Sequence, residues 1–152
     1  MLREGDKAPL FSGLDQDGNK ISLTDYKGKK VVLYFYPEDN TPTCTIESCN
    51  LRDNITPLTK KGFVVVGVSA NDEKSHKKFA TKFNLPFPLL ADTDKKAINA
   101  YGVWGDKSLF GHKYKGIIRT TFVIDEKGKI EKIFNKVKSK NHTQQILESF
   151  ED

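Results

Sequence analysis

The sequence predicts an α/β fold in which a central mixed β-sheet is flanked by helices and preceded by an N-terminal β-hairpin. Two continuous apolar runs, at 31–36 and 63–69, have the composition of strands buried on both faces. A helical segment lies between them, which makes a βαβ unit with a parallel strand pair. The last apolar segments, between 117 and 134, have the pattern of an antiparallel hairpin. A sheet that contains both kinds of pair is mixed.

The N-terminal third is expected to contain the small hairpin and the first long helix. Residues 10–14 and 20–23 flank an Asp-Gly dipeptide at 17–18, which is typical of a two-residue hairpin turn. The helix is expected over 42–61, between the two buried runs. We expect a disturbance at Pro57, because proline has no N–H for the helical hydrogen-bond ladder.

The middle of the chain alternates helix and strand. A helix is expected over 73–83 and a short strand over 87–90, followed by a helix that Asp92 caps and that runs to Tyr101. These segments continue the α/β alternation that places helices against a sheet.

The segment 102–116 is expected to be an irregular connection, because glycines interrupt it. Its aromatic residues Trp104, Phe110 and Tyr114 are interpreted as anchors that hold this connection on the body. The length of the connection is compatible with a functional role.

The C-terminal part is expected to form a hairpin from strands 117–124 and 129–134, and then a closing helix over 142–150. The complete order of elements fits a thioredoxin-like arrangement. No repeat or linker divides the chain, and its 152 residues predict one domain over 1–152.

Composition excludes several classes of protein. With 37% hydrophobic and 30% charged residues, the chain has the composition of a soluble globular protein. No apolar run reaches the ~18 residues of a membrane span, so we expect no membrane partner. The N-terminus has no segment of signal-peptide type, so we expect an intracellular, cytoplasmic location. The net charge is +5, but the lysines are spread along the chain, which argues against a nucleic-acid partner.

The only two cysteines, Cys44 and Cys49, are five residues apart and follow the first buried run. Thr41-Pro42 is a strong helix start, which places Cys44 in the first turn, where the helix dipole favours a thiolate. On an intact helix the two Cα atoms are roughly 8.7 Å apart. A disulfide needs less than about 7 Å, so bonding between these thiols requires local unwinding.

Other interpretations of the cysteines stay open at this point. Both can be ordinary buried residues, because free cysteine is often buried. A metal site is disfavoured, since there is no C-x-x-C and the histidines are scattered. The missing C-x-x-C also argues against a thioredoxin-like disulfide oxidoreductase, and a non-catalytic module that binds through its lysines is a further alternative.

The cysteine region resembles a known family. Pro37-x-x-x-Thr41-x-x-Cys44 matches the active-site signature of the peroxiredoxins, and the spacing of Cys44 and Cys49 resembles the peroxiredoxin Q, or bacterioferritin comigratory protein, subgroup. The similarity covers nearly the whole chain and includes segments 32–37, 101–105 and 119–125.

The resemblance implies a thiol-dependent peroxidase that uses no metal, haem or flavin cofactor. Cys44 is then the peroxidatic nucleophile, which a hydroperoxide oxidises to a sulfenic acid, and Cys49 is the resolving thiol that forms an intramolecular disulfide with it. Thioredoxin or a similar dithiol reductant is the implied partner. The subgroup also favours a monomer, because the resolving thiol is in the same chain.

The resemblance further implies that Thr41 hydrogen-bonds the peroxide, Pro37 shields the thiolate and Arg119 stabilises the charge at Cys44. Arg119 lies in an apolar, strand-like segment of a lysine-rich chain, which suggests a need for a permanently charged planar donor at this position. The alternative is an arginine at a strand edge that extends into solvent. Glu47 is three residues after Cys44 on the same helix face, where it can orient Arg119 or favour the helix dipole.

The chain departs from the usual subgroup pattern at Thr43, where glycine is usual, and at Ser48, where alanine is usual. Thr43 indicates that no positive φ is needed before the cysteine. Ser48 places a polar group beside the resolving thiol, where it can alter the ease of unwinding.

Overall fold

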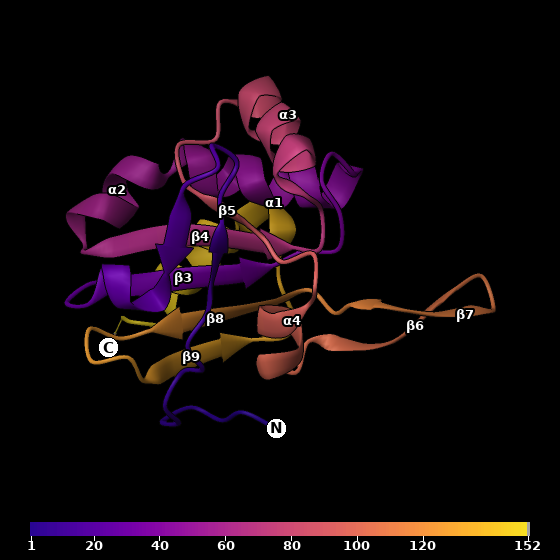
Figure 1. The fold of residues 1–152 in the computed structure, drawn as a ribbon. Helices are drawn as coiled ribbons and strands as arrows, with labels where there is room; N and C mark the ends of the chain where they lie inside the picture. Colours follow the sequence, from indigo (N-terminus) through magenta and orange to yellow (C-terminus); the bar gives the residue numbers. More distant parts are fainter. Residues whose placement is uncertain (152) are drawn as a thin grey trace.

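A mixed sheet lies at the centre of the computed structural model, which describes residues 1–151 (Figure 1). The strand order is β5-β4-β3-β8-β9. β3 (Lys30–Phe35), β4 (Phe63–Ser69) and β5 (Leu89–Ala91) are parallel, and β8 (Thr120–Ile124) and β9 (Ile130–Phe134) add antiparallel strands beside β3. The predicted central mixed sheet is confirmed.

One face of the sheet is covered by α1 (Pro42–Asp53), α2 (Ile55–Lys60), α3 (Glu73–Phe83) and α5 (His142–Glu148). Every second side chain of β3 points into this layer, as expected for a strand with a period of two. The resulting core contains apolar residues from all four helices, among them Leu51, Leu58, Phe79 and Ile146.

The opposite face is covered by the N-terminal segment and by α4 (Lys96–Ala100). β1 (Ser12–Leu14) and β2 (Lys20–Ser22) form the predicted hairpin, and the 3₁₀ helix η1 (Leu23–Tyr26) follows it. Burial of the sheet on both faces explains why β3 and β4 have continuous apolar sequences rather than alternating ones.

The hairpin turn is wider than the predicted two-residue turn. The Asp15 carboxylate accepts hydrogen bonds from the backbone N–H groups of Asp17 and Asn19, and the loop spans the whole interval from Asp15 to Asn19. The short-range side-chain bond of an Asx turn therefore replaces the tight turn that Asp-Gly indicated.

The first long helix breaks at Asn54, not at Pro57 as predicted. Pro57 lies in the first turn of α2, where a missing N–H costs nothing. Continuing α1 would instead have placed the proline ring against the carbonyl of Asp53, four residues earlier. Pro57 thus accounts for the break at Asn54, three residues upstream of its own position.

Asp92 caps α4 although it does not occupy the N-cap position. The residue at the N-cap is Lys95, while the Asp92 carboxylate accepts from the backbone N–H groups of Ala97 and Ile98. The prediction that Asp92 satisfies the start of this helix is therefore confirmed, although it lies three positions before the N-cap.

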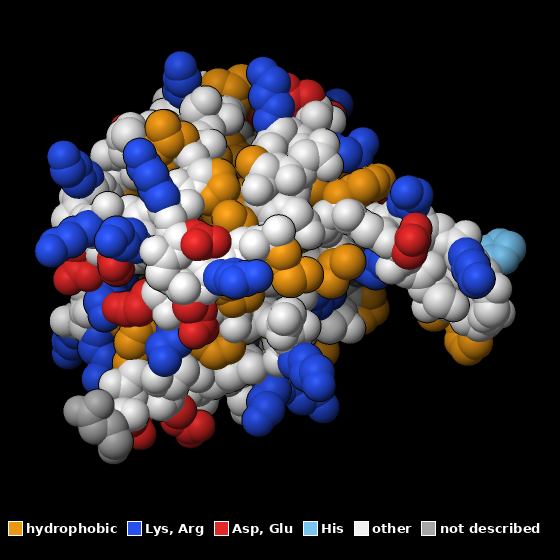
Figure 2. All heavy atoms as spheres, turned by 90° about the horizontal axis from the view of Figure 1, so that it is seen from below, with side chains coloured by type: hydrophobic (Ala, Val, Ile, Leu, Met, Phe, Trp, Pro, Cys, Tyr) orange, Lys and Arg blue, Asp and Glu red, His pale blue; other side chains and the backbone are white. Residues whose placement is uncertain are grey.

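The prediction of an irregular connection over 102–116 was wrong. β6 (Trp104–Leu109) and β7 (His112–Ile117) form a regular antiparallel ribbon, called the arm here, which projects from the body (Figures 1 and 2). Phe110 is not an anchor, because it is fully exposed in the turn at the tip. The arm has no buried face along most of its length, so its sequence lacks the alternation that identifies a strand.

The β3–α1 loop, 36–41, follows the carboxyl end of β3, where open α/β sheets commonly place their ligands. The arm leaves the body on the same side (Figure 1). None of the helices in residues 1–151 combines the length and the apolar character that a membrane span requires.

Candidate active site

Cys44 is held in the first turn of α1, as the sequence predicted. Thr41 occupies the N-cap with extended backbone angles and Pro42 takes the first helical position, so the helix start forms from local sequence alone. Cys44 is only 1% exposed. Thr43 has no positive φ, which confirms that glycine is not required before this cysteine.

The Thr41 hydroxyl does not cap the helix. It donates to the carbonyl oxygen of Glu38, at 2.9 Å, and makes no capping bond to α1. Its two acceptor lone pairs stay available for the O–H of a bound peroxide. The hydroxyl of Thr41 is therefore not used to cap α1.

Arg119 joins Cys44 to Glu47. Its Nη2 donates to Cys44 Sγ at 3.2 Å, and its Nη1 donates to Glu47 Oε1 at 2.6 Å. Arg119 lies between β7 and β8, not inside a strand as predicted, and its side chain is 19% exposed. The alternative of an arginine reaching solvent is excluded by these two contacts, which fix both ends of the guanidinium fork.

Glu47 is completely buried behind Arg119. Burial raises the pKa of Glu47 to about 7, although the Arg119 charge and its hydrogen bond oppose this shift. Glu47 Oε2 has no hydrogen-bond partner among the described residues, and His142 Nε2 lies 3.7 Å from it. Near neutral pH Glu47 is therefore divided between its neutral and ionised forms.

His142 is neutral at the same pH. Burial lowers its pKa to about 4, so its proximity to Glu47 is not an ion pair at neutral pH. His142 Nδ1 lies 2.9 Å from Gln145 Oε1, an acceptor, and therefore carries the ring proton. Nε2 then accepts from the hydroxyl of Thr121 at 2.8 Å. Nε2 also lies 3.7 Å from Glu47 Oε2, the carboxylate oxygen that has no hydrogen-bond partner among the described residues.

These two pKa shifts predict opposing effects of pH on stability. Glu47 binds its proton more tightly when folded, so its contribution is present below pH 4.5 and is lost by about pH 7. His142 binds its proton less tightly when folded, so its contribution is lost as pH falls from 6.5 to about 4. Each change amounts to about 3 kcal/mol. Between pH 4.5 and 6.5 the Glu47 contribution to the free energy of unfolding falls with pH as fast as the His142 contribution rises, so the two changes cancel.

The measurement is the free energy of unfolding by urea for the parent and for Glu47→Gln. Between pH 4.5 and 7 the difference is expected to shift by about 3 kcal/mol in favour of the variant, because glutamine does not titrate. His142→Asn is the control for the opposite effect, because it removes the rise in the free energy of unfolding that His142 causes between pH 4 and 6.5. Parallel curves for parent and Glu47→Gln would contradict the assigned pKa of Glu47.

The β3–α1 loop is fixed by Asp39, a residue that the sequence analysis missed. Its buried carboxylate accepts from the hydroxyls of Tyr36 and Ser75, at 2.6 and 2.7 Å, and contacts His76 Nδ1 at 2.7 Å. The other His76 nitrogen donates to the carbonyl of Leu90. This network ties the loop that carries Thr41 to α3 and β5, and these contacts span too many residues to leave a local sequence signal.

Lys107 of the arm is a second residue that the sequence analysis missed. Its Nζ donates to the carbonyl of Ile117 at 2.9 Å, which brings the ammonium back from the arm toward the site. Burial lowers the pKa of Lys107, and the charge of Arg119 lowers it further, while Cys44 opposes this. The arm thus adds a cation to the surroundings of Cys44.

Cys49 lies one and a half turns further along α1 and is partly exposed. Burial raises the pKa of the Cys49 thiol, and Asp53 adds to this shift while Arg52 opposes it. Both cysteines are free, and α1 is continuous across them. The buried Ser48 hydroxyl shares a 2.9 Å hydrogen bond with Tyr34 of β3, and this bond has to break when that part of α1 leaves the sheet.

The remaining predicted residues are placed as follows. Pro37 is partly buried in the β3–α1 loop, and its shielding of Cys44 stays a prediction. Arg52 of α1 forms an ion pair with Asp53 at 2.8 Å. Residues 1–151 contain no group of three or more His, Cys, Asp or Glu side chains placed to hold a metal ion.

The arrangement provides a buried sulfur, a cation in contact with it and a hydroxyl with free lone pairs at one helix start. A guanidinium stabilises the thiolate and the negative charge that develops on an oxygen leaving group. The site is therefore suited to nucleophilic attack by sulfur on a polar substrate.

Comparison with known proteins gives a consistent result. Residues 4–133 match the model of the AhpC/TSA family. A peroxiredoxin bcp from Coxiella burnetii is 50% identical over 146 residues, which cover 96% of this chain and 97% of that protein. Peroxiredoxin Bcp of Escherichia coli K12 is 46% identical, with 96% and 94% covered.

The fold has a close counterpart among solved structures. A structure of the bacterioferritin comigratory protein of Xanthomonas campestris superposes with a TM-score of 0.85 and 31% identity, covering 91% of this chain and 88% of that chain. That structure is described as giving insights into the alkyl peroxide reduction activity of the Xanthomonas protein.

Proposed function

Because the chain belongs to the AhpC/TSA family, and within it to the peroxiredoxin Q or Bcp proteins, it is a thiol peroxidase, and we propose that Cys44 reduces the peroxide. The observation that carries this assignment is the contact of Arg119 with Cys44 Sγ at 3.2 Å. Within residues 1–151, Cys49 has no cation in hydrogen-bond contact with its sulfur. The site thus prepares one thiol for nucleophilic attack.

In the first step the Cys44 thiolate attacks the terminal oxygen of the hydroperoxide. An S–O bond forms as the O–O bond breaks, and the leaving oxygen takes a proton to depart as water or an alcohol. Hydrogen peroxide and organic hydroperoxides are the proposed substrates, in keeping with the alkyl peroxide reduction named for the Xanthomonas relative.

Arg119 and Thr41 have separate roles in this step. The fixed charge of Arg119 stabilises first the thiolate and then the charge on the breaking O–O bond. Thr41 orients the peroxide by accepting its O–H, since its own hydroxyl proton is bound to Glu38. Glu47 holds the guanidinium fork in place from its buried position.

In the second step the Cys49 thiol attacks the Cys44 sulfenic acid. The two sulfurs form a disulfide and the sulfenic oxygen leaves as water. Helix geometry separates the two Cα atoms by roughly 8.7 Å, so α1 has to unwind locally and break the bond between Ser48 and Tyr34. Thioredoxin or a similar dithiol then reduces the disulfide by exchange. We propose that the chain acts as a monomer, since both thiols lie in one chain. We also propose that it acts in the cytoplasm.

Mass spectrometry after one equivalent of hydrogen peroxide tests this sequence of steps. The parent is expected to lose two hydrogens and to form the Cys44–Cys49 disulfide. Cys49→Ser cannot form the disulfide, so it is expected to gain one oxygen at Cys44 and to stop turning over with thioredoxin. An unmodified Cys44 in both proteins would contradict the proposal, and faster reduction of insulin than of peroxide would favour a disulfide oxidoreductase.

A further inference from the structure

We propose that three lysines on one face of α3 form the docking surface for an acidic face of the dithiol reductant. Lys74, Lys78 and Lys82, called the lysine row here, are spaced four residues apart and are all exposed. Residues four apart lie on the same side of a helix. The inference rests on the proposed function, because it concerns the reduction of the Cys44–Cys49 disulfide.

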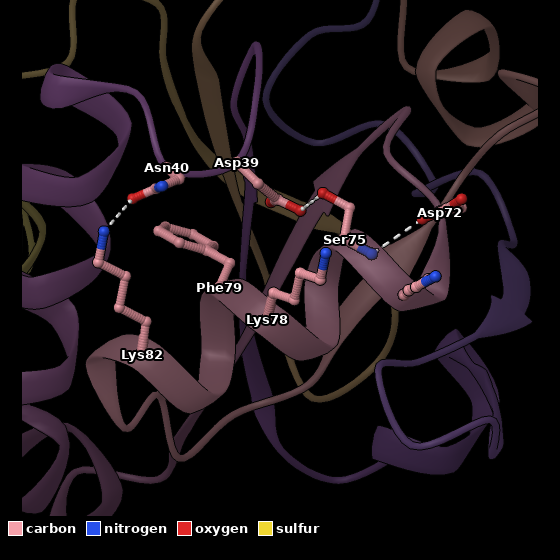
Figure 3. Close-up of a pocket in the computed structure, with 8 residues that line it drawn as sticks. Asp39, Asn40, Asp72, Ser75, Lys78, Phe79 and Lys82 are labelled. Atoms are coloured by element: carbon pink, nitrogen blue, oxygen red, sulfur yellow. Dashed lines mark hydrogen bonds between the residues drawn. The ribbon is translucent and has the colours of Figure 1, made fainter.

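The lysine row borders a cavity of about 400 Å³ beside the β3–α1 loop (Figure 3). The loop contributes Asp39 and Asn40 to one wall, and α3 contributes the other. In Figure 3 the side chains of Lys78 and Lys82 extend from α3 toward the loop. The cavity therefore connects the lysine row to the segment that leads into the active site.

The ammonium groups of the lysine row lack carboxylate partners. Among residues 1–151, none of the three forms a salt bridge, and the one side-chain hydrogen bond is from Lys82 Nζ to Asn40 Oδ1 at 3.3 Å. The Asp39 carboxylate in the same cavity is already bound to Tyr36, Ser75 and His76. Like charges four residues apart destabilise a helix, so this arrangement is not explained by the stability of α3.

Another lysine of α3 behaves differently. Lys77 contacts Asp17 at 2.6 Å, so its charge is compensated within the protein. The unpaired charges are thus confined to the face that borders the β3–α1 loop. The cavity is also lined by the carboxylate of Asp72, which accepts from the backbone N–H of Ser75 at the start of α3. A surface on which cations outnumber unpaired anions attracts a partner of the opposite sign and accelerates its encounter.

The end of α3 that carries Lys82 contacts residues on either side of the segment that contains both cysteines. At one point Lys82 contacts Asn40, which directly precedes the helix start at Thr41. Beyond the row, Arg52 of α1 donates to the carbonyl of Phe83 at 2.8 Å, and its charge acts on the Cys49 thiol. A protein seated on the row therefore also meets the cation nearest Cys49.

The cavity is not the peroxide site. Cys44, Thr41 and Arg119 are absent from its lining, so a small molecule held there does not reach the reacting sulfur. The reductant has a different requirement, because its target is the disulfide formed after α1 unwinds. A protein surface can bind the row and present its dithiol to the released segment, which makes the reductant the better occupant.

The chemistry of the docked complex is ordinary thiol exchange. A thiolate of the reductant attacks one sulfur of the disulfide, which releases the other as a thiolate and leaves a mixed disulfide. The second thiol of the reductant then displaces the remaining sulfur and becomes oxidised itself. The lysine row takes no part in these bonds and acts only on the encounter and the stability of the complex.

The test compares a triple variant, Lys74→Gln, Lys78→Gln and Lys82→Gln, with the single control Lys77→Gln, which removes an α3 lysine that is already paired with Asp17. Steady-state assays of peroxide reduction use one of two reductants. The first is a thioredoxin with a net negative charge, and the second is dithiothreitol, a small uncharged dithiol. The triple variant is expected to lose about tenfold or more in kcat/KM for thioredoxin, mainly through KM, and most of its salt dependence. The control is expected to match the parent, and rates with dithiothreitol are expected to be unchanged.

Three outcomes would overturn the proposal. Unchanged kcat/KM for thioredoxin would show that the row does not dock the reductant. An equal loss with dithiothreitol would show that the substitutions act on the thiols or on folding. Slower single-turnover oxidation by a carboxylate-bearing hydroperoxide, but not by hydrogen peroxide, would assign the row to substrate. Failure of the proposed function is distinguishable, since peroxide would then leave Cys44 unoxidised in the parent.

Discussion

Cys44→Ser is expected to reduce peroxide turnover to the uncatalysed rate. A serine hydroxyl is hardly ionised at neutral pH and cannot form the sulfenic acid, so both the attack and the later disulfide are lost. The measurement is the consumption of hydrogen peroxide coupled to thioredoxin oxidation. The expected effect is the largest of any single substitution in this chain.

The serine variant has to be shown to fold, because Cys44 is buried. Its urea midpoint is expected to stay close to that of the parent, since serine has nearly the same shape and can keep a hydrogen bond with Arg119. Thr43→Ala, at the exposed neighbouring position, serves as the matched control and is expected to keep its activity. Turnover retained by Cys44→Ser would overturn the assignment of the nucleophile.

Arg119→Met is expected to slow the oxidation of Cys44 by about 10²–10³-fold, which is the usual cost of removing one preorganised donor from a reacting oxygen. The substitution removes the cation that contacts Cys44 and leaves Glu47 buried without its partner. The measurement is stopped-flow oxidation of Cys44 in a single turnover, which excludes effects on the reductant.

Two further substitutions separate charge from geometry. Arg119→Lys keeps a positive charge but cannot hold Cys44 and Glu47 with one planar fork, so an intermediate rate is expected. Arg52→Met is the matched control, because Arg52 binds Asp53 and the carbonyl of Phe83 and makes no contact with Cys44. Equal oxidation rates for Arg119→Met and the parent would remove Arg119 from the chemistry.

The strands and long helices were predictable because their signals are local. The runs at 31–36 and 63–69 are continuous apolar segments, and the structure places β3 and β4 there, buried between two layers. The helix over 73–83 was predicted with the same bounds that the structure gives α3. In these segments, burial acts on residues that are consecutive or periodic in the sequence.

The arm and the helix break were not predictable in the same way. β6 and β7 pair mainly through backbone hydrogen bonds and expose most of their side chains, so burial leaves no periodic pattern in them. The break at Asn54 lies three residues before Pro57 and depends on the steric effect of the proline ring on the carbonyl of Asp53. Both features follow from the backbone, which sequence patterns report only indirectly.

The sequence by itself determined that Cys44 lies in the first turn of a helix after a buried strand and that Cys49 follows it at a distance unsuited to a disulfide in an intact helix. These are consequences of helix geometry and of spacing over a few residues. The resemblance then assigned roles to Thr41, Pro37 and Arg119.

Only the tertiary structure decided how the charges around Cys44 are arranged. Arg119 is 75 residues from Cys44, and His142 reaches Glu47 from the last helix. Asp39 is fixed by His76, 37 residues away, and the lysine row lies beside the same loop because α3 packs there. Such contacts form when the sheet brings distant segments together, and burial then sets the protonation of Glu47 and His142, so no local pattern can contain them.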